Sequence, residues 1–66
     1  MEAQKLIREW VRAEGRKLSW LAEQVPVHAG DLSRWLNGKQ MPRAVYRVRL
    51  TDITGINVKD ETMWRA

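Results

Sequence analysis

Apolar residues recur along most of this chain at the spacing of amphipathic helices. Over residues 2–14 they stand at i, i+3, i+4, i+7 and i+8, which places one apolar stripe on one face of a helix. The stripe consists of Ala3, Leu6, Ile7, Trp10 and Val11. Gly15 follows it, and a glycine in the left-handed conformation is a common end to a helix. The pattern therefore predicts a helix over residues 2–14.

Two shorter helices are expected next, separated by a proline. The first covers residues 18–25 and ends at Pro26, because proline disfavours a helical conformation in the residue before it. The second covers residues 29–37 and is capped by Gly38. The residues expected to face inward are Leu21, Ala22 and Val25 on the first helix and Leu32, Trp35 and Leu36 on the second.

A fourth helix is expected from Pro42 to Thr54, since proline is tolerated at the first helical position, with Gly55 as its cap. The residues available for its packing are Val45, Tyr46, Val48, Leu50 and Ile53. The tail, residues 56–66, is open between a short strand and one more helical turn. Residues 1–66 are thus predicted to form a single all-α domain of four to five helices with a short C-terminal tail.

Composition narrows the class of protein. The chain has 66 residues, a formal net charge of +4, no cysteine and one histidine. Disulfides, thiolate zinc sites and cysteine nucleophiles are therefore excluded. No apolar run reaches membrane-spanning length, and the N-terminus lacks the apolar stretch of a signal peptide. We expect a small cytoplasmic binding protein that is not an enzyme and uses no cofactor or metal.

The positive charge is concentrated in one segment. Between Leu32 and Leu50 the chain has basic residues and no acidic one, whereas the flanking segments carry no positive excess. The basic residues are Arg34, Lys39, Arg43, Arg47 and Arg49. An unbalanced positive segment is typical of a protein that binds a phosphate backbone. The alternative is a solvated face that serves only solubility.

Two short helices joined by a tight turn are the outline of a helix-turn-helix. Here the outline consists of Leu21-Ala22, Val25, the turn Pro26-Val27, Leu32 and Trp35, followed by Asn37-Gly38-Lys39 and Pro42. This pattern, over Gly15 to Val58, resembles the Cro/cI-type helix-turn-helix family of phage repressors. The stretches RWLNGKQMP and TGINV look most like small Cro-like and YdaS-type prophage regulators. The resemblance places the helix-turn-helix at residues 18–37.

The resemblance implies a sequence-specific repressor that occludes a promoter, with the helix 29–37 in the major groove. The implied base-reading residues are His28, Ala29, Ser33 and Arg34. Arg34 is the strongest of them because its planar guanidinium can bind guanine O6 and N7 together. The alternative for Arg34 is an ion pair with Asp31 on a solvated helix surface.

Phosphate contacts are expected from the ends of the motif. The implied residues are Lys17, Ser19, Asn37, Gly38, Lys39 and Arg43. Arg47 and Arg49 extend the basic segment, but they point to different sides of their helix, so one of them is expected to lie away from the DNA.

Proteins of this family generally form dimers, often through the region after the fourth helix. The tail is then the dimer element, and its expected contacts are Ile56, Val58, Met63 and Trp64. The implied partner is double-stranded DNA with a pseudo-palindromic operator, without a membrane or a small-molecule substrate. Two alternatives use the same scaffold: a small phage inhibitor or adaptor that binds a protein, and an antitoxin that represses its own operon.

The chain departs from the family pattern in the turn and at its edges. Leu18 stands where a phosphate-binding glutamine is usual, and Pro26 replaces a glycine of positive φ. Small residues, Ala29 and Gly30, begin the groove helix, so base readout is expected to be sparse and supplemented by DNA shape. Of the four tryptophans, Trp10 and Trp35 are expected in the core. Trp20 and Trp64 are open between partial burial and an interface.

Overall fold

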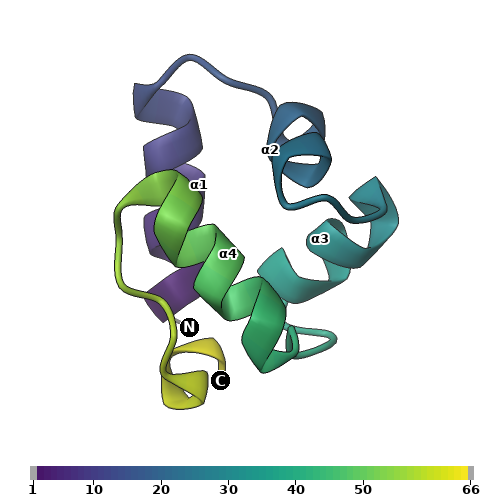
Figure 1. The fold of residues 1–66 in the computed structure, drawn as a ribbon, viewed down its shortest axis with the longest axis vertical. Coiled ribbons are helices and arrows are strands. Elements are labelled where there is room, and N and C mark those ends of the chain that lie inside the picture. Colours follow the sequence, from purple (N-terminus) through teal and green to yellow (C-terminus); the bar gives the residue numbers. More distant parts are fainter. Residues whose placement is uncertain (1, 66) are drawn as a thin grey trace.

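The computed structural model describes residues 2–65, which form helices and no strand. The elements in chain order are α1 (Glu2–Ala13), α2 (Leu18–Gln24), α3 (Ala29–Leu36), α4 (Ala44–Thr54) and a short 3₁₀ helix, η1 (Glu61–Trp64). Figure 1 shows α1, α4 and η1 on one side of the molecule and α2 with α3 on the other. The predicted all-α class is confirmed, and the tail contains a helical turn in place of a strand.

The ends of the helices follow the glycines and prolines of the sequence, with one correction. The predicted caps Gly15, Gly38 and Gly55 have φ angles of 66°, 73° and 74°. The prediction that Pro42 begins the fourth helix is wrong, because α4 begins at Ala44. Pro42 is instead fully buried, and its carbonyl oxygen accepts a hydrogen bond from a side chain of α4.

The core draws side chains from α1 to α4 and from the tail. Its buried apolar residues are Ala3, Ile7, Val11, Leu21, Ala22, Val25, Leu32, Trp35, Leu36, Leu50, Val58 and Trp64. Every inward residue predicted for the second and third helices is therefore confirmed. Two residues of the predicted stripe of the first helix, Leu6 and Trp10, are only half-buried.

Apolar residues lie on both sides of α4, and only one side packs on the core. Leu50 is fully buried, whereas Val45 and Val48 are 51% and 43% exposed. Val45 and Val48, two of the residues available for packing, therefore do not pack on the core, because they project from the side of α4 that faces away from Leu50. Tyr46 and Ile53 are half-buried against the core.

The turn between α2 and α3 is built around Pro26. The Val25–Pro26 peptide bond is cis, and no residue of the turn has a positive φ. The backbone N–H of Val27 donates to the carbonyl oxygen of Ala22 at 2.8 Å, which closes the turn.

None of the helices described is long and apolar enough to cross a membrane.

Two of the tryptophans pack against each other at the side of α1. The rings of Trp10 and Trp20 are stacked with their centroids 6.2 Å apart, and the guanidinium of Arg16 lies 4.4 Å from the centroid of the Trp20 ring. Partial burial within the chain therefore accounts for Trp20, which the sequence leaves open between partial burial and an interface.

Candidate nucleic-acid interface

The outward face of α3 is built by its own amphipathic pattern. Leu32, Trp35 and Leu36 are buried, which turns the opposite side of the helix toward solvent. The predicted base-reading residues His28, Ala29, Ser33 and Arg34 are all exposed on this helix or directly before it. His28 occupies the N-cap position, and its side chain makes no capping hydrogen bond. The surface that the sequence analysis singles out is therefore accessible to a ligand.

Arg34 forms an ion pair in the free protein. Its Nη2 donates to Oδ1 of Asp31, three residues earlier, with side chains that are 55% and 42% exposed. Such an exposed pair is worth only about 0.2–1 kcal/mol, because water screens both charges. Nη1 of Arg34 also lies 3.9 Å from the position that a Cβ on Gly30 would occupy, so the guanidinium extends toward the N-terminal end of α3. The ion pair between Arg34 and Asp31 that the sequence offers as an alternative is thus present in the free protein. Because the pair is weak, a ligand can replace Asp31 as the partner of the guanidinium at little cost.

A side chain of α1 joins this face, which the sequence analysis missed. Nη2 of Arg8 donates to Oδ1 of Asn37 at 2.8 Å, and Nδ2 of Asn37 donates to Oγ of Ser33 at 3.3 Å. Arg8 belongs to the segment in which acidic and basic residues balance, so charge counting gave it no weight. The signal available was its spacing of four residues from Arg12, which places two cations on one side of a helix.

The predicted phosphate-binding residues lie at the ends of α2, α3 and α4. Lys17 is the N-cap of α2, with Ser19 exposed in its first turn. Gly38 and Lys39 follow α3, and Gly38 adopts the positive φ that only glycine tolerates readily. Arg43 is the N-cap of α4, where its cation adds to the positive end of the helix dipole. All of these residues are exposed.

Arg43 and Arg8 lie on different sides of α3. Arg43 lines a hollow of about 180 Å³ together with Asp31 and Trp35, whereas Arg8 reaches α3 through Asn37 and Ser33. Successive residues of a helix are about 100° apart, so Asp31 and Ser33 project from opposite sides. The exposed face of α3 is therefore flanked by one arginine from α4 and one from α1.

The remaining two cations of the basic segment hold the fold together. Arg47 donates from Nε to the carbonyl oxygen of Lys59 at 2.8 Å and from Nη1 to that of Pro42 at 2.7 Å. Arg49 donates from Nη1 to the carbonyl oxygen of Val25 at 3.2 Å. One of Arg47 and Arg49 is expected to lie away from the DNA, and both donate hydrogen bonds to backbone carbonyl oxygens of the chain.

Two of the four expected dimer contacts in the tail, Val58 and Trp64, require a correction, whereas Ile56 and Met63 stay predictions. Val58 is 0% and Trp64 3% exposed, and Nε1 of Trp64 donates to the carbonyl oxygen of Val58 at 2.9 Å. These two residues complete the core of their own chain and have no surface to offer a second copy. Ile56 and Met63 are half-buried against the same core. In a chain this small the tail is needed to cover α1, because little other apolar material is available.

Within residues 2–65 no three His, Cys, Asp or Glu side chains lie together as a metal site would require. Comparison with known proteins adds no relative: no protein-family model, no curated protein and no solved structure is significantly similar to this chain.

Proposed function

We propose that this chain is a sequence-specific, double-stranded DNA-binding repressor that places α3 in the major groove. The observation that carries the proposal is the exposed face of α3 with an arginine on either flank, Arg8 from α1 and Arg43 from α4. The major groove is about 12 Å wide and is bordered by the phosphates of both strands, so a helix lying in it needs cations on both sides. Lys39, beyond the C-terminal end of α3, extends this cationic border.

Within this proposal Arg34 supplies most of the sequence information. Its guanidinium lies at the N-terminal half of α3, where groove helices meet base edges. To bind guanine, it exchanges one exposed partner, the carboxylate of Asp31, for the two acceptors of the base. Ser33, already bonded to Asn37, contributes a hydroxyl that donates or accepts and so discriminates little.

The proposal includes a homodimer on a pseudo-palindromic operator, which represses by covering a promoter in the bacterial cytoplasm. Val58 and Trp64 of the tail are buried in the core of their own chain, so we assign the contact between copies to the exposed side of α4. Val45 and Val48 are the large apolar side chains most exposed among the described residues. A second copy would cover this pair, and two α3 helices would then meet half-sites about one helical turn apart.

The test is selection of bound duplexes from a random pool, combined with the mass of the protein in solution. The proposal expects an enriched site with two related halves. Its binding constant should fall as salt rises, with a log–log slope of about −0.9 for each phosphate contacted. Val48→Glu should lower the mass to that of a monomer while leaving the helical content unchanged. Absence of any enriched duplex, or a flat salt profile, would overturn the DNA-binding proposal.

A further inference from the structure

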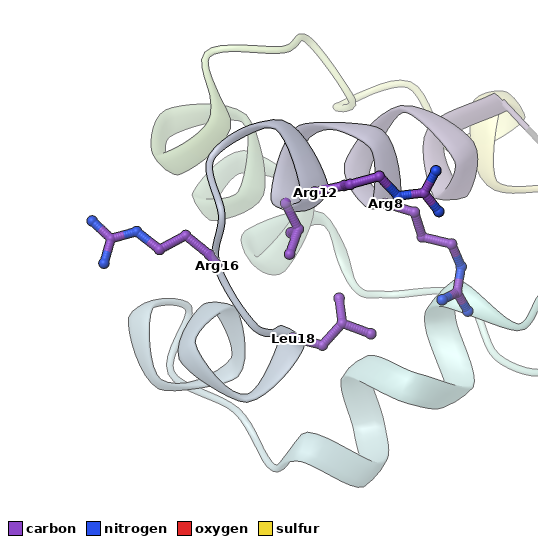
Figure 2. Close-up of a pocket in the computed structure, with 5 residues that line it drawn as sticks. Arg8, Arg12, Arg16 and Leu18 are labelled. Carbon is purple, nitrogen blue, oxygen red and sulfur yellow. The ribbon is translucent and has the colours of Figure 1, made fainter.

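A hollow of about 300 Å³ lies between α1 and the start of α2, and its rim is cationic. It is lined by Arg8, Val11, Arg12, Arg16 and Leu18. Figure 2 shows the side chains of Arg8 and Arg12 projecting to the same side, with Arg8 directed toward α3, whereas Arg16 extends the opposite way. The guanidinium of Arg16 is stacked on Trp20. The hollow therefore has a two-arginine end beside α3 and a separate end occupied by Arg16.

Arg8 and Arg12, the two arginines at the end beside α3, form no ion pair among the described residues. In the described part of the chain, the ion pairs join Arg34 to Asp31 and Arg65 to Glu61, and neither involves Arg8 or Arg12. Two cations four residues apart on a helix repel each other, and an anion placed between them relieves that repulsion. Guanidinium groups bind phosphate oxygens through two parallel N–H donors, which makes a phosphodiester the matching anion.

We infer that Arg8 and Arg12 bind one backbone phosphodiester of the duplex, on the strand opposite to the one that Arg43 contacts. The inference rests on the proposed function, since it takes the duplex to lie along α3. Arg8 is already held against α3 by its 2.8 Å bond to Asn37, so a phosphate at this end of the hollow belongs to the DNA that α3 meets. Helix α1 thereby becomes part of the DNA-binding surface and fixes the depth at which α3 enters the groove.

The test measures the salt dependence of duplex binding for Arg8→Gln, Arg12→Gln, the double variant and Arg16→Gln. Each substitution removes one positive charge at an exposed arginine that lines the hollow. Arg16→Gln is therefore a matched control. The double variant should make the negative slope of log Kobs against log salt shallower by about 0.9, the value for a single phosphate. Arg16→Gln should leave the slope as in the wild type.

The outcomes separate this inference from the proposal beneath it. If the wild type binds a duplex but all four variants have the same salt slope as the wild type, the inference fails and the proposed function stands. If the wild type binds no duplex at low salt, the proposed function fails and the inference with it. Inorganic phosphate is titrated against the wild type at constant ionic strength, with the arginine side-chain resonances observed by NMR. Half-saturation of Arg8 and Arg12 below about 1 mM would assign the hollow to a free phosphate and overturn the assignment to DNA.

Discussion

The side-chain amide of Gln4, in the first turn of α1, donates a 3.1 Å hydrogen bond to the carbonyl oxygen of Trp64 at the other end of the chain. The same nitrogen donates to the carbonyl oxygen of Trp35 at 3.2 Å. Both neighbours are acceptors, so the amide nitrogen must be the atom that faces them. Gln4 is 3% exposed, and its two direct bonds hold η1 and the C-terminal turn of α3 against α1.

We expect Gln4→Leu to lower the free energy of unfolding by about 1–3 kcal/mol. The substitution keeps the volume of the side chain but leaves the buried carbonyl of Trp64 without its donor. Chemical denaturation followed by circular dichroism measures the change, with Gln24→Leu on the exposed side of α2 as the control. Equal unfolding midpoints for the two variants would show that the buried amide contributes nothing.

Arg47 and Arg43 should differ in what they contribute, Arg47 to stability and Arg43 to duplex binding. Arg47→Met retains the aliphatic part of the side chain but loses the hydrogen bonds to Lys59 and Pro42. We expect it to cost about 1.5–3 kcal/mol of stability, the range for hydrogen bonds to a charged group. Arg43→Met should stay within about 0.5 kcal/mol of the wild type, as an exposed substitution does. In a duplex-binding assay Arg43→Met should weaken binding, and a stability loss at Arg43 equal to that at Arg47 would contradict this division.

Arg34 and its partner Asp31 should change DNA binding in opposite directions. Arg34→Ala is expected to cost about 1–3 kcal/mol on the selected duplex and to remove the preference at one base pair, whereas Lys39→Ala weakens all sequences alike. Asp31→Asn releases Arg34 from its ion pair and removes a negative charge near the phosphates. It should tighten binding about two- to fivefold. Affinities for the selected duplex and a scrambled one decide the matter, and weaker binding by Asp31→Asn would count against Arg34 as the base-reading residue.

Asp60 gives the tail a dependence on pH. The backbone N–H of Thr62 and then its hydroxyl donate to Oδ1 of Asp60, and these bonds hold the pKa of the carboxyl below its ordinary value of 3.8. A carboxylate whose pKa is lowered by folding stabilises the folded chain fully above the unfolded pKa and loses that contribution as the pH falls through the lowered value.

The stability difference between the wild type and Asp60→Asn should therefore be constant between about pH 5 and pH 7 and should shrink below about pH 3.8. Denaturation at a series of pH values measures this difference, and Asp52→Asn on the exposed side of α4 is the charge-matched control. A difference that grows on acidification would contradict the assigned direction.

The sequence was sufficient for the features that depend on neighbours within a few positions. The apolar spacing and the glycine caps predict α1, α2 and α3 to within one residue at each end, because helix formation and capping are local. The same spacing places Ser33 and Arg34 outside the buried stripe of Leu32, Trp35 and Leu36, and both side chains are exposed. Because proline cannot adopt a positive φ, Pro26 also predicts a turn without a positive φ at that position, as the structure has it.

The tertiary structure alone decided how distant segments share surface and charge. Val58 and Trp64 stand in a tail without a clear period, so only the space left beside α1 settles that they face their own core and not a second chain. Arg8 meets Asn37 across 29 positions, a contact that no local spacing encodes. The charge count treats all five cations of the basic segment alike, yet backbone carbonyls from other elements engage Arg47 and Arg49. Local periodicity determines which side of a helix is apolar, whereas long-range packing decides which distant residues the side chains of the helix contact.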